Sequence, residues 1–242
     1  MKRPVLILGA RSAIGIAIAR RFAELGHPIQ LAARFAHSLG AEAEYLRNRY
    51  GVAVNCVEFD VLEYGDGILS RLPTMPQIVI CVVGRLHPPD LGGSNAAAVA
   101  LTVRTNFEGP ACVLSDIARL FVGAGGGIIV GISSVAGERG RSSNYIYGAA
   151  KAGFTAFLSG LRASVARSGV RVVTVLPGYV RTPMTAGASL PALLTAEPME
   201  VADAIHRAVI HKKDVVYVRP IWRIIMMMVR LIPESIFKWS KF

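Results

Sequence analysis

The fold is decided near the N-terminus by the stretch Pro4–Gly15, which reads PVLILGARSAIG. An apolar run at 4–8 predicts a buried strand, and residues 14–25 repeat apolar side chains at helical spacing until a glycine ends the pattern. The turn between them comprises Gly9, Ala10, Arg11, Ser12, Ala13, Ile14 and Gly15. Backbone amides and the helix N-terminus in such a turn can hold a pyrophosphate, although paired glycines there also serve tight packing alone. The stretch therefore predicts a strand–turn–helix unit and leaves its ligand open.

Short apolar, β-branched runs alternate with longer helical patterns along the chain, which is the signature of βαβ units and of a parallel sheet buried on both faces. We expect strands at 4–8, 29–33, 52–59, 78–82, 127–132, 171–176 and 215–218, and helices at 14–25, 39–50, 96–121, 145–167 and 199–209. Since no linker, charge block or internal repeat divides it, we predict an α/β fold. A single Rossmann-type domain with a doubly wound parallel sheet is expected over residues 1–220, followed by an amphipathic C-terminal tail over residues 221–242.

The composition is apolar and basic at once. The 242 residues are 52% hydrophobic and 18% charged, with a mean hydropathy of +0.45, which excludes fibrous, collagen-like and disordered chains. Lysine and arginine number 27 against 16 acidic residues, a net charge of +11, and 21 of the bases are arginine. This charge indicates an anionic partner, which is nucleic acid, a phosphorylated cofactor or an acidic membrane surface. Residues 211–242 hold 7 bases and 2 acids, so +5 of the excess lies there.

Cysteine usage and the N-terminus indicate the compartment. Cys56, Cys81 and Cys112 lie far apart, without a CxxC pair or a histidine at ligand spacing. We therefore expect neither a disulfide framework nor a metal site, and a cytoplasmic location. The N-terminal residues imitate a secretory signal, but Arg11 interrupts the apolar run, and no stretch reaches the ~18 apolar residues of a membrane-spanning helix.

A cation follows the second predicted strand, in the sequence Ala32-Ala33-Arg34. Dinucleotide-binding folds that prefer NAD place an acidic residue there to hold the ribose hydroxyls, whereas arginine suits a 2′-phosphate. Arg11 is a second candidate for the same phosphate. We expect NADP(H) as cofactor and leave NAD(H) open; the alternative is that both arginines are ordinary solvated side chains.

The strongest chemical signal lies in the helix predicted at 145–167, where Tyr147 and Lys151 share one face because they are four residues apart. A free phenol has a pKa near 10, and we expect the adjacent ammonium to lower it, which makes Tyr147 a candidate acid. Ser133 and Ser134 close the fifth strand at the carboxyl edge of the sheet, where ligands bind in open α/β folds. The alternatives are that Tyr147 and Lys151 lie on an ordinary amphipathic helix, and that the two serines only cap a helix.

In these residues the chain resembles the short-chain dehydrogenase/reductase family, over nearly its whole length and in the family's order. The matched positions are the glycine loop at Gly9, Ala13 and Gly15, the adenine-facing pair Asp60 and Val61, the loop glycine Gly84, the tetrad Asn106, Ser134, Tyr147 and Lys151, and Pro177, Gly178, Val180 and Thr182 of the nicotinamide loop. The chain departs from the family at Ala13, which replaces the middle glycine, and at Cys81-Val82-Val83, which replaces Asn-Asn-Ala.

The resemblance implies an enzyme that transfers hydride from a reduced nicotinamide to a carbonyl. It implies that Tyr147 donates the proton, that Ser134 orients the carbonyl oxygen, and that Lys151 holds the ribose. It also implies that Asn106 anchors a water, that Thr182 meets the nicotinamide carboxamide, and that the protein is a homo-oligomer.

Further stretches resemble those family members that reduce the 2-keto sugar of a polyprenylphosphoryl pentose in cell-envelope arabinose synthesis. They lie at 133–139, 147–153, 180–184 and 226–237. This resemblance implies a lipid-linked ketone substrate and a flavin oxidase as partner. Another small-molecule ketone, such as a 3-oxoacyl chain, a steroid-like ketone or a simple sugar, is the alternative. We expect the small, apolar residues between Pro183 and Pro198 to form a lid over the substrate.

The stretch 221–242 alternates apolar side chains with four cations, and Pro233 divides it into two short predicted helices. Apolar faces with cations and tryptophans are typical of helices in the headgroup region, which predicts peripheral contact with the inner face of a membrane. The alternatives are packing against a second subunit or over the substrate cleft. A nucleotide-sensing protein without chemistry would have a damaged tetrad, and a nucleic-acid-binding protein would show a recognition motif, so we expect neither.

Overall fold

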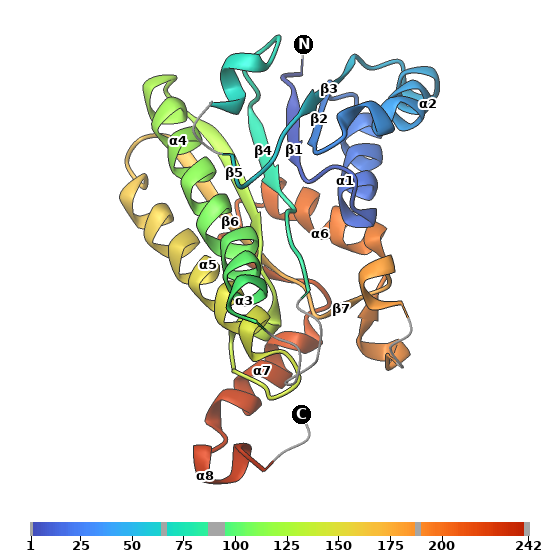
Figure 1. Cartoon of the computed structure of the whole chain (residues 1–242). Helices are drawn as coiled ribbons and strands as arrows, with labels where there is room; N and C mark the ends of the chain where they lie inside the picture. The colour runs from blue at the N-terminus through green and yellow to red at the C-terminus, as the bar shows by residue number, and fades with distance from the viewer. Residues whose placement is uncertain (1, 64–66, 87–94, 187–189, 240–242) are drawn as a thin grey trace.

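The computed structural model describes residues 2–63, 67–86, 95–186 and 190–239. Within these residues lies a parallel sheet of seven strands in the order β3-β2-β1-β4-β5-β6-β9 (Figure 1). The strands are β1 (Val5–Leu8), β2 (Ile29–Ala33), β3 (Val54–Glu58), β4 (Ile78–Cys81), β5 (Gly127–Ile132), β6 (Val170–Leu176) and β9 (Val215–Tyr217). The chain runs outward from β1 to β3 and then crosses back to β4 on the other side of β1. The crevice beyond the strand ends at such a reversal is the usual ligand site of open α/β sheets.

The predicted strands coincide with β2 and β5, and the other five end within two residues of their expected bounds. The largest difference is in β3, predicted at 52–59 and observed at Val54–Glu58. β3 is an edge strand, and its ladder with β2 runs from Val54 to Glu58, so it ends where β2 ends. The predicted α/β fold with a doubly wound parallel sheet is confirmed.

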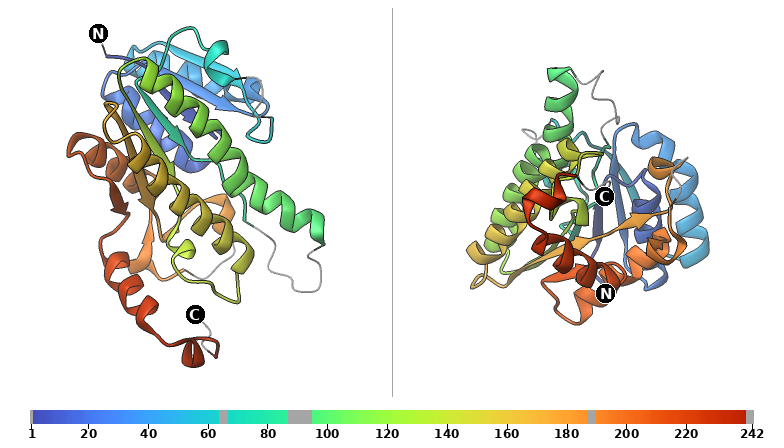
Figure 2. Two further views of the ribbon diagram at one scale, coloured as in Figure 1. Left: turned by 90° about the vertical axis from the view of Figure 1, so that its left-hand side faces the viewer. Right: turned by 90° about the horizontal axis from the view of Figure 1, so that it is seen from below.

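Helices cover both faces of the sheet (Figures 1 and 2). One face packs against α1 (Ala13–Glu24), α2 (Gly40–Tyr50) and α6 (Pro198–Ile210), and the other against α4 (Gly109–Gly123) and α5 (Tyr145–Ser164). Successive residues of a strand point to opposite faces, so Val5 and Ile7 of β1 lie in the first core and Leu6 and Leu8 in the second. Burial of both faces explains why the strands are continuous apolar runs in the sequence.

The single helix predicted at 96–121 is wrong, because a π turn interrupts it. α3 (Ala96–Val103) passes through this turn, Arg104–Glu108, into α4. Gly109, which follows the turn, lies so close to the loop after β3 that a Cβ on it would come within 2.3 Å of the Val61 carbonyl oxygen. Within the turn, Asn106 is fully buried. Apolar periodicity does not distinguish one wider turn from a regular helix, and such turns often mark functional sites.

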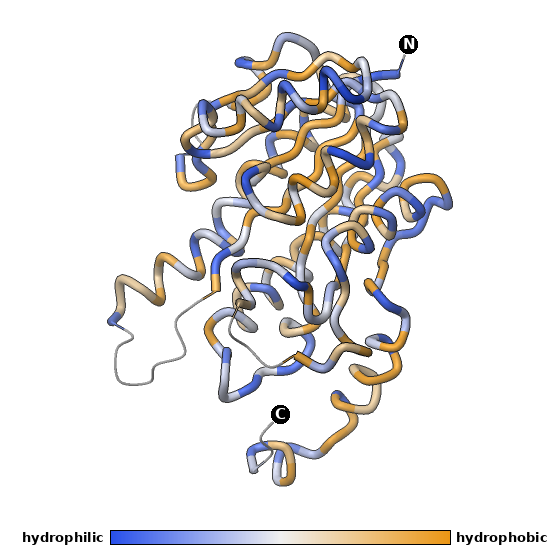
Figure 3. Tube along the Cα trace, turned by 90° about the vertical axis from the view of Figure 1, so that its right-hand side faces the viewer, coloured by the Kyte–Doolittle hydropathy of each residue, from blue (hydrophilic) through white to orange (hydrophobic). Residues whose placement is uncertain are grey.

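The C-terminal stretch forms α7 (Ile221–Leu231) and α8 (Glu234–Phe237), which confirms that Pro233 divides it. One face of α7 is buried through Trp222, Met226 and Val229 and packs with Val135 and Leu176, beyond the carboxyl ends of the strands (Figure 1). The rest of the tail is also largely hydrophobic (Figure 3). Its exposed apolar side chains include Ile224, Met227, Met228, Leu231, Ile236 and Trp239. Within the described ranges, the helices are too short or too polar to cross a membrane.

Candidate active site

A continuous cleft lies at the carboxyl edge of the sheet, where the strand order reverses. It consists of two hollows of about 580 Å³ and 510 Å³, which share Arg11, Ser12 and Gly84 in their linings. We call the first the outer hollow, which extends to Arg34, and the second the reaction hollow, which extends to Tyr147. Volumes of this size suit an extended cofactor together with a substrate. In the described part of the chain, no group of three or more His, Cys, Asp or Glu side chains is arranged to hold a metal ion.

The turn after β1 is tightly packed, and the helix that follows it begins with backbone amides that have no intrahelical acceptor. Gly9 has a φ of 91°, and a Cβ on Gly15 would lie 2.8 Å from the Gly9 carbonyl oxygen. Ser12 caps α1, since its hydroxyl donates to that carbonyl and accepts the Gly15 amide, both at 3.0 Å. Ala13 and Ile14 line the reaction hollow, and their amides lie in the first helical turn, where no intrahelical acceptor exists. The paired glycines thus serve close packing and also shape a turn that can bind phosphate.

Arg34 and Arg11 both line the outer hollow, together with Asp60 and Val61. Arg34 has 65% of its side chain exposed, and its Nη1 lies 3.9 Å from Asp60 Oδ2. Arg11 Nη1 donates to the Arg34 carbonyl oxygen at 3.3 Å, and its guanidinium lies 5.6 Å from the centre of the Phe35 ring. The ion pair with Asp60 is long and exposed, so the Arg34 guanidinium is available to an anionic ligand.

Sequence reasoning missed Glu58, the last residue of β3. Its carboxylate accepts the amides of Ala36 at 2.8 Å and Phe35 at 2.7 Å, and these two hydrogen bonds hold the pKa of Glu58 below its usual range. Phe35 has a left-handed φ of 56°, so the carboxylate fixes the sharp turn that directly follows Arg34. The available signal was an acidic residue at the end of the strand beside β2.

Tyr147 and Lys151 lie on α5 and both line the reaction hollow. Lys151 is buried, and its Nζ donates to the Ile132 carbonyl oxygen at 3.1 Å and to that of Val83 at 3.5 Å. The same Nζ lies 5.9 Å from the centre of the Tyr147 ring. Burial lowers the pKa of Lys151 to about 8, so the ammonium is still the main form at neutral pH. The lysine therefore connects the backbone after β4 and the end of β5 to the tyrosine.

The pKa of Tyr147 is raised, because burial disfavours the phenolate; the hydrogen bond with the Ser134 hydroxyl opposes this effect. The expectation that Lys151 lowers this pKa is therefore wrong for the free protein, where the cost of burying the phenolate dominates. The ammonium is engaged by two backbone carbonyl oxygens instead. A phenol that is protonated at neutral pH and lies beside a serine hydroxyl is suited to donate a proton.

The two serines after β5 have different positions. Ser133 Oγ donates to the Lys151 carbonyl oxygen at 3.0 Å and lies 2.6 Å from Thr155 Oγ1, so it fixes α5 against the sheet. Ser134 Oγ accepts the Ala136 amide at 3.1 Å and is the serine hydroxyl that acts on the pKa of Tyr147. Ser134 therefore caps a short turn, as the alternative held, and also faces the phenol.

Asn106 supports the loop after β4. Its side-chain amide donates to the carbonyl oxygens of Arg85 at 2.8 Å and Thr102 at 2.9 Å, and its Oδ1 accepts the Arg85 amide at 3.0 Å. A Cβ on Gly84 would lie 3.3 Å from Asn106 Oδ1 and 3.6 Å from Lys151 Nζ. The glycine thus lets the asparagine and the lysine approach one another, and the structure brings all four tetrad residues to one place.

The loop after β6 closes the reaction hollow. The Pro177 carbonyl oxygen accepts the Val135 amide at 3.0 Å, which ties this loop to the Ser134 segment. Val180 lies in β7 (Tyr179–Val180), which pairs with β8 (Thr195–Ala196). The Thr182 amide donates to Thr185 Oγ1 at 3.1 Å. The reaction hollow is also lined by Pro177, Gly178, Val180 and Thr182. These are the residues that the family resemblance assigns to the nicotinamide.

Trp222 of α7 also lines the reaction hollow, although the sequence assigned it only to the tail. A Cβ on Gly178 would come within 1.9 Å of its indole ring, and the indole Nε1 donates to the Leu194 carbonyl oxygen at 3.1 Å. The buried face of the tail therefore packs over the cleft, which was one of the three possibilities that the sequence left open. A glycine in one loop and a tryptophan far along the chain carry no local signal of this contact.

The tail is also held to the segment that follows Ser134. Arg139 donates to Glu234 at 2.6 Å, and its guanidinium lies 4.4 Å from the centre of the Phe237 ring. Glu138 in the same segment lies 3.6 Å from Arg230 Nη1 of α7. It also accepts the hydroxyl of Tyr217 in β9 at 2.6 Å, and desolvation together with this carboxylate raises the pKa of Tyr217 to about 12.

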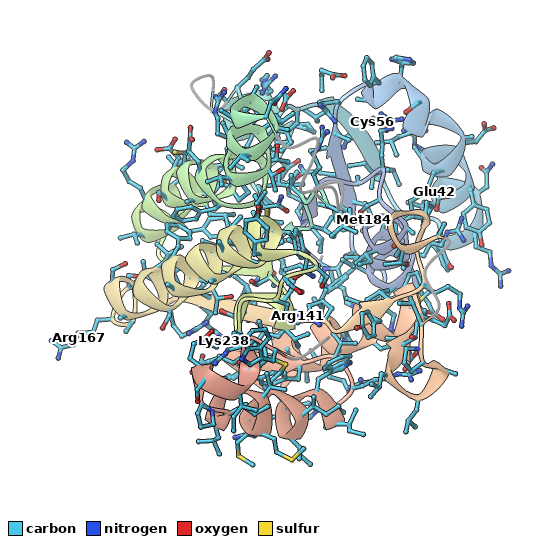
Figure 4. The ribbon with its side chains drawn as sticks, turned by 60° about the horizontal axis from the view of Figure 1, so that its bottom comes forward. Glu42, Cys56, Arg141, Arg167, Met184 and Lys238 are labelled. Atoms are coloured by element: carbon cyan, nitrogen blue, oxygen red, sulfur yellow. The ribbon has the colours of Figure 1, made fainter. Side chains whose placement is uncertain are left out.

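The predicted lid at 183–198 lies partly outside the described residues. Its described part contains short turns at Pro183–Thr185 and Ala192–Leu194. Met184, which is labelled in Figure 4, borders both hollows, and Leu190 borders the reaction hollow. These contacts agree with an apolar cover over the substrate end of the cleft.

Comparisons with known proteins agree with this architecture. Residues 3–191 match the family described as short chain dehydrogenase. The chain is similar to an uncharacterized oxidoreductase of Mycobacterium tuberculosis, 35% identical over 97% of this chain and 96% of that one, and to one of Streptomyces coelicolor, 34% identical over 98% and 95%. Among solved structures, it is similar to a short-chain dehydrogenase from Sphingobium yanoikuyae in complex with NADPH, with 29% identity, a TM-score of 0.82 and coverage of 96% and 97%. The chain belongs to the short-chain dehydrogenase family and is an NAD(P)-dependent oxidoreductase.

Proposed function

We propose that this protein reduces a ketone to a secondary alcohol with NADPH as hydride donor. One observation supports this most strongly: Tyr147, whose phenol stays protonated at neutral pH, and Ser134 line the same largely apolar hollow as the buried Lys151 ammonium. The phosphate-binding turn borders the same hollow, so a reduced nicotinamide and a carbonyl can meet there.

Four side chains divide the remaining work. The bound cofactor supplies a hydride to the carbonyl carbon. The Ser134 hydroxyl donates a hydrogen bond to the carbonyl oxygen, and Tyr147 transfers its phenolic proton to that oxygen as the negative charge develops. Lys151 would hold the nicotinamide ribose and stabilise the tyrosinate left behind, and Asn106 would anchor a water that restores the proton. One hydride and one proton convert the ketone to the alcohol.

Two cations support NADPH over NADH. Arg34 and Arg11 border the hollow that receives the adenosine half of the cofactor, and no carboxylate follows β2 to hold the two ribose hydroxyls. The related Sphingobium yanoikuyae enzyme is described as a complex with NADPH. We expect NADH to be a weaker donor.

Transfer of deuterium tests this function directly. The protein is incubated with ketones and NADPH deuterated at the nicotinamide C4, and the alcohol is examined by mass spectrometry. We expect deuterium at the carbinol carbon. Tight NADPH binding without transfer to any ketone would instead support a nucleotide-sensing protein.

The finer proposal is that the ketone is the 2-keto sugar of a polyprenylphosphoryl pentose, supplied by a flavin oxidase. The apolar lining of the reaction hollow by Leu86, Met184 and Trp222 supports a substrate with an apolar part. The same lining also favours a 3-oxoacyl or steroid-like ketone, and a related structure is described as a bulky-bulky ketone specific alcohol dehydrogenase from Comamonas testosteroni, 26% identical with a TM-score of 0.80. Comparing NADPH oxidation with the 2-keto lipid sugar and with these ketones decides between them, and no turnover of the sugar would remove the finer proposal.

We also propose that the exposed face of the tail contacts an anionic membrane surface and that the protein is a homo-oligomer. The exposed side chains Ile224, Met228 and Leu231 lie on the same short helix as the exposed Arg223 and Arg230. Replacing the three apolar residues with serine leaves the buried face of α7 intact. The variant should lose flotation with phosphatidylglycerol vesicles, and unchanged flotation would contradict this role; light scattering on both proteins measures the oligomeric state.

A further inference from the structure

Arg141 lies in the loop between Ser134 and α5. Its side chain lines that hollow together with Ser134 and Tyr147. In Figure 4, Arg141 lies between α5 and the tail. Arg167, which follows α5, extends away from the protein. The position of Arg141 is therefore that of a cleft residue rather than of an ordinary surface cation.

One nitrogen of the Arg141 guanidinium lacks a hydrogen-bond acceptor. Its Nε is inaccessible to solvent and has no hydrogen-bond acceptor in the described chain. Arg139, two residues earlier, is by contrast paired with Glu234. Buried polar groups in proteins are nearly always hydrogen-bonded, so an unpaired donor in a cleft indicates a partner that arrives with a ligand.

A second polar group in the lining of this hollow is also unpaired. Asn144 Oδ1 is buried, has no donor among the described residues, and belongs to a side chain that lines the same hollow. Much of the nearby lining is apolar, including Val135, Ala136 and Leu190. Both side chains therefore bring an unmatched polar atom to a hollow whose lining is largely apolar. The turn proposed to bind the cofactor phosphates lies between β1 and α1, so Arg141 and Asn144 belong to a different segment of the chain.

We infer that the ketone substrate carries an oxyanion, a carboxylate or a phosphate, and that Arg141 binds it while the carbonyl faces Tyr147. The planar guanidinium fork matches both oxyanions and forms charge-assisted hydrogen bonds with them, which are strong where water is excluded. This inference rests on the proposed ketone reduction, because it assigns the substrate class of that same site.

Binding can be measured without turnover, because Trp222 lines the hollow and Trp239 is the only other tryptophan. The experiment uses the Trp239→Phe protein saturated with NADP⁺ and follows Trp222 fluorescence. One probe pair is 6-oxoheptanoate and its methyl ester; the other is 5-oxohexyl phosphate and 6-hydroxyhexan-2-one. We expect the charged member of at least one pair to bind at least about tenfold more tightly than its neutral partner. The pair that shows the larger preference tells carboxylate from phosphate.

Three variants assign that preference to Arg141. Arg141→Gln should abolish it, Arg141→Lys should keep a reduced preference, which a misfolded protein would not show, and the matched control Arg167→Gln should keep it in full. Equal binding of charged and neutral probes, or a full preference in Arg141→Gln, would overturn the inference. NADPH oxidation with the neutral probes is a separate readout of the proposed function. Turnover without a preference for the oxyanion removes only the inference, whereas Arg141-dependent binding without turnover removes only the proposed function.

Discussion

The outer hollow and the reaction hollow share the lining residues Arg11, Ser12, Val82, Val83, Gly84, Leu86 and Met184, and differ in the rest of their linings. Apart from Met184, the outer hollow takes its lining from residues 9–105, mainly from the loops after the first four strands. Besides the shared residues, the reaction hollow takes its lining from Ala13 and Ile14, from residues within 132–151 and 177–186, from Leu190 and from Trp222 of the tail. One end of the cleft is therefore made by local turns, and the other by contacts between distant segments. Changes at the two ends should consequently have different effects.

The largest effect is expected at the phosphate-binding turn. Gly15→Val places a side chain against the Gly9 carbonyl oxygen, where even a Cβ would lie at 2.8 Å, so the turn cannot keep its shape. We expect the Kd for NADPH, measured by calorimetry, to rise by at least about 100-fold, because the first-turn amides lose their alignment. Gly160→Val is the control, since a Cβ at that position meets nothing within 4 Å. Normal NADPH binding by Gly15→Val would show that this turn does not hold the phosphates.

A change at the other end should separate substrate turnover from phosphate binding. Gly178→Ala requires the Trp222 ring to move, because the new Cβ would lie 1.9 Å from it. We expect kcat/KM for a ketone to fall by about 10- to 100-fold, since misplacing a reacting group by about 1 Å has effects of this size. The Kd for NADP⁺ should change much less than in Gly15→Val. Equal losses of cofactor binding in both variants would show that the two ends are not independent.

Cofactor choice should depend on the outer hollow alone. Arg34→Asp replaces a cation with a carboxylate that repels a 2′-phosphate and can bind two ribose hydroxyls. We expect the ratio of kcat/KM for NADPH to that for NADH to fall by about 10- to 100-fold, which corresponds to the loss of one or two charge-assisted contacts. Arg167→Gln should leave the ratio unchanged. An unchanged ratio in Arg34→Asp would assign this arginine to the solvated surface.

A smaller effect concerns stability and pH. Burial lowers the pKa of Lys151 from 10.5 to about 8, so below pH 8 the fold carries the full cost of a buried ammonium. Between pH 8 and 10.5 the native state releases this proton before the unfolded state does, and the stability of the cofactor-free protein should rise relative to Lys151→Met. The expected gain is about 3 kcal/mol at most, measured by urea unfolding at pH 7.5 and pH 10. A difference between the two proteins that does not vary with pH would contradict the lowered pKa.

The difference between local turns and contacts of distant segments also explains which features the sequence could predict. Two strands coincide with their predicted bounds, and Gly9, Ser12 and Gly15 occupy the expected turn, because apolar runs and turn residues are local signals. The sequence order also predicted that Ser134, Tyr147 and Lys151 would meet, through their resemblance to a family pattern.

The failures have physical causes. The π turn around Asn106 leaves no mark on apolar periodicity, and the raised pKa of Tyr147 depends on burial, which follows from the complete fold. The contact between Gly178 and Trp222 joins residues that share no pattern in the sequence. The tail shows amphipathic character in sequence, but only the structure shows which face covers the cleft.

The central claim is that Tyr147 donates the proton in ketone reduction. Tyr147→Phe keeps the ring and removes the hydroxyl, so its effect on packing is small. We predict that NADPH oxidation in the presence of a ketone falls by at least about 100-fold, the usual contribution of a positioned general acid, while the Kd for NADPH changes by less than about threefold. Turnover within tenfold of the parent protein, with NADPH still bound, would contradict the claim.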